Sequence, residues 1–261
     1  MLKTRIISAL VGLPLLFLVL IKGGALLTFS LVALSILGLN EFYNATKNIG
    51  IRPFKIFGYL SAIFLYLIFD KIKFAEIDLF VALSMLLFLL FLTNKKYTLK
   101  DYAVTLMGIV YIPLLFLYIQ KIRYLPHGLY TVWLVFIVSW ITDTFAYFTG
   151  KFLGNHKLAP DLSPKKTVEG AIGGLLGSTL ASFLFVWIFP QTNITPYEAL
   201  IVGSFGSLIA QAGDLAASFI KRNCYIKDFG NVIPGHGGIL DRFDSILFAS
   251  PFVYFIFKYF L

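Results

Sequence analysis

Most of the ionisable residues that could do chemistry in this apolar chain lie between Ser218 and Ser245. This stretch reads SFIKRNCYIKDFGNVIPGHGGILDRFDS and combines cations, carboxylates and a glycine-rich turn. Cations and backbone N–H groups bind phosphate oxygens, whereas carboxylates bind hard metal ions. The stretch therefore predicts phosphate chemistry assisted by a metal ion. Its candidate residues are Lys221, Arg222, Lys227, Asp228, His236, Gly237, Gly238, Asp241, Arg242 and Asp244.

Four carboxylates are the candidate metal ligands. Asp143 and Asp214 interrupt apolar segments, where a carboxylate costs about 2.5–3.5 kcal/mol and is expected to face a partner, water or an ion. Asp241 and Asp244 are three residues apart and share one helix face. Stabilisation of a helix start is the alternative role for this pair. An oxygen-ligand Mg²⁺ site explains all four, whereas a single nearby His and Cys do not suit zinc.

A second polar cluster lies at residues 161–170. Ser163 and Pro164 predict a helix N-cap and a first-turn proline. Lys165 and Lys166 would then lie at a helix start, which is a favourable place for an anion. The alternative is that these lysines only mark the cytoplasmic side of a membrane. For His236, phosphate binding, proton transfer and simple orientation of its loop remain open.

The elements that position these residues are predicted to be membrane helices. Only 13% of the 261 residues are charged and the mean hydropathy is +0.85, whereas soluble domains carry about 25% charge. The chain is predicted to be an all-α polytopic integral membrane protein with one domain, residues 1–261, comprising N-terminal helices in 1–125 and catalytic helices and loops in 126–261. About nine spans are expected, at 6–21, 25–46, 54–69, 76–93, 102–120, 129–149, 168–189, 198–217 and 243–261. The small residues of 170–177 predict a close helix-packing face.

The distribution of positive charge predicts the orientation. With a cytoplasmic N-terminus, sixteen of the 22 Lys and Arg residues lie on the inner side and six on the outer side. All four candidate carboxylates then lie near the cytoplasmic surface. The net charge of +9 is explained by basic loops beside anionic lipids, so no nucleic-acid partner is expected. The single cysteine, Cys224, excludes a disulfide framework.

The C-terminal half resembles the phosphatidate cytidylyltransferases, also called CDP-diacylglycerol synthases. The pattern of that family runs S-x-x-K-R, four residues, K-D, a short spacer and G-H-G-G-x-x-D-R-x-D-S, and residues 218–245 match it. Three further elements are similar, in the expected order: D-T-x-A-Y at 143–147, S-P-K-K-T-x-E-G at 163–170 and G-D-L at 213–215. Ala217 and Phe229 depart from the pattern, and the N-terminal half matches only in being apolar.

The resemblance implies an enzyme that converts CTP and phosphatidate into CDP-diacylglycerol and pyrophosphate, requires Mg²⁺ and forms a homodimer. It further implies a multi-pass protein of the cell (inner) membrane whose active site faces the cytoplasm. The number of metal ions, including a second cation, is left open. The expected catalytic residues are Asp143, Asp214, Lys221, Lys227, Asp241 and Asp244, of which the four aspartates bind metal; the expected substrate-binding residues are Ser163, Lys165, Lys166, Thr167, Arg222, His236, Gly237, Gly238 and Arg242.

Three alternatives remain: a CTP-dependent lipid kinase, a cytidylyltransferase for another lipid, and an ion-coupled transporter. A transporter would place its acidic groups near the middle of the membrane, accessible from both sides. The acidic groups here gather on one side, beside a basic loop, which favours the enzyme. Glu41 and Asp101, also on the cytoplasmic side, are expected to tolerate alanine far better than Asp241 and Asp244.

Overall fold

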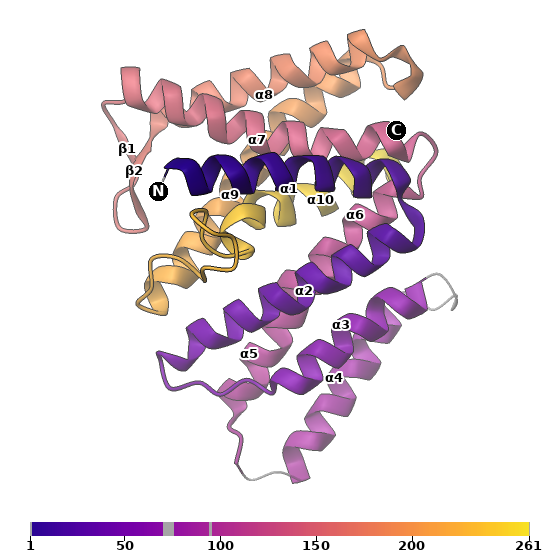
Figure 1. Cartoon of the computed structure of the whole chain (residues 1–261), viewed down its shortest axis with the longest axis vertical. Helices are drawn as coiled ribbons and strands as arrows, with labels where there is room; N and C mark the ends of the chain where they lie inside the picture. The colour runs from indigo at the N-terminus through magenta and orange to yellow at the C-terminus, as the bar shows by residue number, and fades with distance from the viewer. Residues whose placement is uncertain (1, 70–75, 94–95, 261) are drawn as a thin grey trace. The chain divides into compact units, whose positions relative to one another are not determined.

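The computed structural model describes residues 2–69, 76–93 and 96–260, and these residues form mainly helices. Figure 1 shows the helices along the chain, with one short hairpin of strands. The chain divides into two compact units. The first comprises Met1–Leu117 and Asn223–Arg242, and the second comprises Tyr118–Arg222 and Phe243–Leu261. Each unit therefore combines two segments that are separate in the sequence.

The helix positions agree with the expected spans to within a few residues. For example, α2 covers Gly24–Lys47 and α8 covers Val168–Ile188. Among the described residues, five helical segments are long and apolar enough to cross a membrane. Three shorter apolar helices accompany them, at Ile6–Lys22, Lys55–Leu67 and Val81–Phe91. The structure thus supports a multi-span helical protein. The five segments are Gly24–Lys47, Leu99–Arg123, Gly128–Leu153, Val168–Ile188 and Pro196–Asn223.

The first unit is built around α2. The first helix, α1, ends at Lys22 and α2 begins at Gly24, so that only Gly23 lies between them. Both glycines have positive φ, a left-handed backbone that favours residues without a side chain. The ring of Tyr43 packs where Gly58 and Gly108 lack side chains, and its hydroxyl donates to the carbonyl of Thr105 (2.9 Å). The helices of this unit are α1 (Leu2–Lys22), α2, α3 (Lys55–Phe69), α4 (Glu76–Thr93), α5 (Leu99–Ile109) and the π-turn η1 (Val110–Leu114).

The expected span at 102–120 is not one regular helix. Pro113 interrupts it, because proline has no N–H to continue the helical hydrogen bonds. The chain widens into η1 there and then continues as α6 (Leu115–Arg123). The hydroxyl of Tyr66 donates to the carbonyl of Pro113 (3.0 Å) and also bonds the hydroxyl of Ser35 (3.0 Å). A buried polar group at the break is thereby satisfied.

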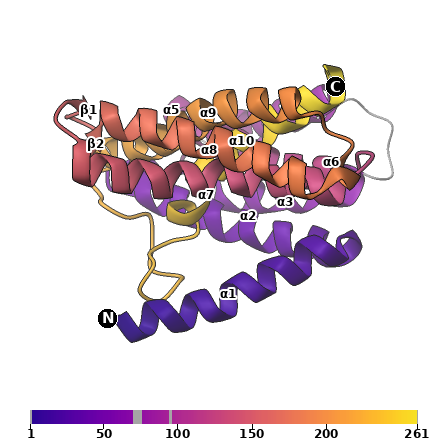
Figure 2. The same cartoon turned by 90° about the horizontal axis from the view of Figure 1, so that it is seen from above.

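The second unit is dominated by α7 (Gly128–Leu153) and α8, which lie side by side in Figures 1 and 2. Small residues of α8 allow this close approach: a side chain at Gly174 would meet the carbonyl oxygen of Thr142, and one at Gly173 would meet Thr149. This confirms the predicted packing face at 170–177. The remaining elements are β1 (Lys157–Ala159), β2 (Ser163–Thr167), η2 (Pro190–Thr192), α9 (Pro196–Asn223) and α10 (Leu240–Tyr259).

The segment before α8 is a strand, so the expected helix start at Ser163 is wrong. Residues Ser163–Thr167 pair antiparallel with β1, and α8 begins at Val168. Thr167 is the N-cap, and its hydroxyl accepts from the N–H of Gly170 (3.1 Å). Pro164 is compatible with the edge of a two-stranded hairpin, where its missing N–H is not needed. The hairpin lies beside the end of α7 and the start of α8 (Figure 2), and β2 contains Lys165 and Lys166.

Candidate active site

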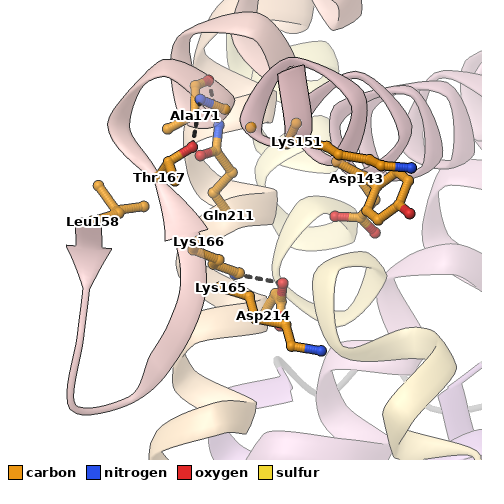
Figure 3. Close-up of a pocket in the computed structure, with 13 residues that line it drawn as sticks. Asp143, Lys151, Leu158, Lys165, Lys166, Thr167, Ala171, Gln211 and Asp214 are labelled. Atoms are coloured by element: carbon orange, nitrogen blue, oxygen red, sulfur yellow. Dashed lines mark hydrogen bonds and ion pairs between the residues drawn. The ribbon is translucent and has the colours of Figure 1, made fainter. Parts of the chain in front are cut away.

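The second unit contains a cavity of about 510 Å³ where α7, α8 and α9 meet the hairpin. Figure 3 shows its side chains, with Asp143 from α7, Lys165 and Lys166 from β2, and Asp214 from α9. Cations and carboxylates from separate elements therefore share one cavity. The lining residues are Asp143, Ala146, Tyr147, Gly150, Lys151, Leu158, Lys165, Lys166, Thr167, Gly170, Ala171, Gln211 and Asp214.

An ion pair crosses the cavity between β2 and α9. The ammonium of Lys166 contacts the carboxylate of Asp214, and each side chain is about a quarter exposed (25% and 26%) (Figure 3). Lys165 and Lys151 also line the cavity and add two more positive charges. A cavity with three ammonium groups suits a ligand that carries several negative charges.

Three of the four predicted metal-binding aspartates come together in this unit. The Asp244 side chain is buried (9% exposed), and the charges that act on it are the carboxylates of Asp214 and Asp143 and the ammonium of Lys221. The Ser245 hydroxyl donates to Oδ2 of Asp143 (3.4 Å), and the Ser245 N–H donates to Oδ1 of Asp244 (2.8 Å). Three segments that are far apart in the chain, on α7, α9 and α10, thus approach one another here.

The donor chemistry of this cluster fits a hard cation. Carboxylate and hydroxyl oxygens are ligands that Mg²⁺ accepts, and neighbouring carboxylates repel one another unless a cation lies between them. Over the described residues, no three His, Cys, Asp or Glu side chains are placed closely enough to enclose an ion. The cluster thus matches Mg²⁺ by the type of its ligands but does not enclose an ion. In this structure the positive charge beside Asp214 is the ammonium of Lys166.

Asp241, the fourth predicted metal ligand, holds a loop. Within the first unit, its Oδ2 accepts from the N–H groups of Phe229 (2.8 Å) and Gly238 (3.0 Å). The loop turns at Gly235 and Gly237, which both have positive φ. Arg242 is also used locally, since its Nε donates to the carbonyl of His236 (2.7 Å). The D-R pair at the start of α10 thus fixes the conformation of the glycine-rich turn.

Glu41 has a structural role that the sequence analysis did not foresee. This residue of α2 is buried (4% exposed), and its carboxylate accepts from the N–H groups of Ile239 (2.9 Å) and Leu240 (3.0 Å). A side chain at Gly230 or Gly238 would collide with it. Glu41 therefore binds the first N–H groups of α10 and packs against the loop. The same rule that drew attention to Asp143, a carboxylate within an apolar span, could have found it.

Asp101 is also structural. Its Oδ2 accepts from the N–H (2.7 Å) and the hydroxyl (2.8 Å) of Thr98, and its Oδ1 accepts from the N–H of Arg52 (2.6 Å). The side chain is buried (4% exposed). As at Glu41, alanine here would leave backbone N–H groups without their partner, a cost that the sequence analysis did not include.

The other predicted site residues are dispersed. In the second unit, Ser163 begins β2 and does not line the cavity. The positive charge of Lys221 acts on the carboxyl group of Asp244. Nε of Arg222 donates to the carbonyl of Leu162 (3.2 Å). In the first unit, Lys227 is exposed, whereas Nδ1 of His236 is buried without a hydrogen-bond partner. His236, Gly237 and Gly238 form part of the turn that Asp241 and Glu41 hold.

Three cavity residues with polar side chains were missed by sequence reasoning: Tyr147, Lys151 and Gln211. Lys151 lies one helical turn after Tyr147, with its ammonium 6.0 Å from the centre of that ring. The Gln211 amide donates to the carbonyl of Ala171 (3.2 Å) and to the hydroxyl of Ser207 (3.3 Å). Asp143, Tyr147 and Lys151 follow one another at four-residue intervals on α7 and so share one helix face, a signal that could have identified Tyr147 and Lys151.

Comparison with known proteins identifies a family that matches nearly the whole chain. The family described as "Cytidylyltransferase family" matches residues 3–260. A protein of Staphylococcus saprophyticus named phosphatidate cytidylyltransferase is 36% identical over 256 residues, which cover 95% of this chain and 96% of that protein. Proteins of the same name from Staphylococcus haemolyticus and Staphylococcus epidermidis are 34% identical over equal shares of the two chains.

Proposed function

We propose that this chain, which belongs to the cytidylyltransferase family, transfers the cytidylyl group of CTP to phosphatidate. The products would be CDP-diacylglycerol, a precursor of phospholipids, and pyrophosphate. The observation that carries this proposal is the cavity in which Lys151, Lys165 and Lys166 face the carboxylates of Asp143 and Asp214. Full-length similarity to proteins named phosphatidate cytidylyltransferase supports it.

The chemistry of the reaction explains the charges of the cavity. A phosphate oxygen of phosphatidate attacks the α-phosphorus of CTP, a new P–O bond forms, and the bond to the departing pyrophosphate breaks. Both reactants are anions, so the site must reduce their repulsion and align them. Lys165 and Lys166 are placed to bind phosphate oxygens, with Lys151 beside them. No general base is needed, because the attacking phosphate is already ionised.

Magnesium dependence is part of the proposal. Asp143, Asp214 and Asp244 would hold the ion, with Asp241 contributing directly or by positioning its loop. Bound Mg²⁺ would neutralise charge on the phosphate oxygens as the pyrophosphate leaves. The ion pair with Lys166 orients Asp214 within the cavity.

We also propose the arrangement in the membrane. Nine spans with a cytoplasmic N-terminus explain the uneven distribution of Lys and Arg, and one membrane domain would contain both compact units. The cavity would then open toward the cytoplasm, where CTP is available, at the inner membrane that supplies the lipid. A homodimer remains an expectation from the family resemblance.

The position of a radioactive label distinguishes the candidate reactions. Purified full-length protein in phosphatidylcholine nanodiscs is given phosphatidate, Mg²⁺ and CTP labelled at either the α- or the γ-phosphate. Label in the lipid from α-labelled CTP alone supports cytidylyl transfer, whereas label from γ-labelled CTP identifies a lipid kinase. Another lipid acceptor in place of phosphatidate tests the third alternative. No labelled lipid with any acceptor or divalent metal would overturn the proposal.

A further inference from the structure

The first unit contains a second cavity, which is lined mainly by cations. It measures about 300 Å³ and lies where the end of α2, the following loop and the segment before α5 meet. It shares no lining residue with the candidate active site. The six residues that line it include no carboxylate, and four are positively charged: Lys47, Arg52, Pro53, Lys55, Lys96 and Tyr97.

Lys55 is fixed in the wall of this cavity by neighbouring amides. Its ammonium donates to Oδ1 of Asn44 (2.6 Å) and to Oδ1 of Asn40 (3.1 Å). The hydroxyl of Tyr59 donates to the same Asn40 oxygen (3.1 Å), which orients that amide. Lys47 lies close enough for its positive charge to act directly on Lys55. Two like charges held together cost free energy that a bound anion would remove.

The two loops that bear the other cations are tied together by Asp101. One oxygen of its carboxylate accepts from the backbone of Arg52, and the other accepts from Thr98, close to Lys96 in the chain. The charge of Asp101 offsets part of the charge of Arg52. The lining still includes four positively charged side chains and no carboxylate. The ring of Tyr97 also packs against Phe54, with 5.3 Å between ring centres. The cavity is therefore preorganised, which lowers the entropic cost of binding.

We propose that this cavity is a second phosphate-binding site, distinct from the catalytic one. Its ligand is a phosphate-bearing anion, either the headgroup of an acidic phospholipid or a soluble pyrophosphate. Arg52 suits such a ligand because a guanidinium binds two phosphate oxygens at once. Positive charge that only sets membrane orientation needs to lie on one side of the bilayer, not to converge on one cavity. This inference does not rest on the proposed function.

Lysine acetylation, followed residue by residue by mass spectrometry, tests the proposal. Full-length protein is labelled in nanodiscs of phosphatidylcholine alone, in the same nanodiscs with inorganic pyrophosphate, and in nanodiscs that also contain phosphatidylglycerol. We expect Lys47 to react several-fold more slowly in at least one of the latter two arms, and the arm that protects it identifies the source of the phosphate. Arg52→Gln should weaken that protection about tenfold, whereas the neighbouring exposed Lys100→Gln should not.

Two results would overturn the proposal. One is equal acetylation of Lys47 in all three arms. The other is equal slowing of Lys47 and Lys100, which would mean that the anion only screens a diffuse surface charge. Lys165 and Lys166 report on the catalytic cavity in the same spectra. Because these two lysines line the other cavity, they can be protected or left unprotected independently of Lys47. This inference and the proposed reaction can therefore fail separately.

Discussion

Lys166 and Asp214 form an ion pair that joins the β-hairpin to α9. The pair brings a lysine from a strand and a carboxylate from a candidate membrane helix into one cavity. It prevents Asp214 from standing as an uncompensated charge beside Asp143 and Asp244. The pair thus links the lysines of the hairpin to the carboxylates of the proposed site.

Lys166→Gln should lower kcat/KM for CTP by about 10- to 100-fold, because it removes a charged contact to a phosphate group worth about 1.5–3 kcal/mol. The measurement is steady-state formation of labelled lipid. Lys157→Gln is the matched control, since Lys157 lies on the partner strand β1, is exposed and does not line the cavity. Equal losses in both variants would assign the effect to the hairpin as a whole.

Asp244→Asn should raise the Mg²⁺ concentration for half-maximal activity by about 10- to 100-fold, because it replaces a carboxylate of the cluster with an amide, which is a weaker ligand for a hard cation. A titration of activity with Mg²⁺, after removal of divalent ions by chelation, measures this change. Asp161→Asn changes the same charge at an exposed turn of the hairpin and should leave the titration unchanged. An unaltered Mg²⁺ requirement in Asp244→Asn would contradict the metal assignment.

Gly213→Ala should impair activity more than its size suggests. A methyl group there would lie 2.7 Å from the carbonyl oxygen of Asp244 and 2.9 Å from the Cβ of Phe248, so α9 and α10 would have to separate. Because Asp214 follows directly in the chain, the two carboxylates would move apart, and we expect the Mg²⁺ requirement to rise. Gly12→Ala is the control, since a methyl group at Gly12 meets no atom within 4 Å.

Glu41→Ala should destabilise the loop before α10 by about 3 kcal/mol or more, because two backbone N–H groups lose a buried partner. Cys224, the only cysteine, is buried (2% exposed) and adjoins this loop, so its reaction rate with a maleimide reports loop opening. We expect faster labelling in Glu41→Ala and a smaller increase in Glu41→Gln, which keeps one acceptor oxygen. Glu198→Ala, at an exposed cap, should not change the rate.

Asp241→Asn distinguishes loop positioning from metal binding. Asparagine keeps one side-chain carbonyl oxygen, so it can still accept from Phe229 and Gly238 as Oδ2 does now. If Asp241 only holds the loop, this variant should retain most activity and a normal Mg²⁺ titration, while Asp241→Ala loses both activity and slow Cys224 labelling. A large rise in the Mg²⁺ requirement of Asp241→Asn would show that the carboxylate charge itself is needed.

The helices, and several of the charged residues that line the candidate site, were predictable from local sequence. Long apolar runs give helices wherever a membrane replaces water, because only internal hydrogen bonds can satisfy the backbone there. The positions of α2 and α8 and the glycine packing face followed from this rule. A carboxylate inside such a run signals a partner, which is why Asp143 and Asp214 were found, and the same rule applied to Glu41 would have found it too.

Tertiary structure alone decided which charged groups meet. Ser163–Thr167 became a strand because β1 supplies backbone partners, a pairing that local propensity does not contain. The roles of Asp241 and Asp244 diverge although they share a helix: one accepts from loop N–H groups, and the other is buried beside Asp143 and Asp214. Sequence therefore determined the residue types and their helices, whereas packing determined their partners, because contacts between distant segments depend on how the helices approach one another.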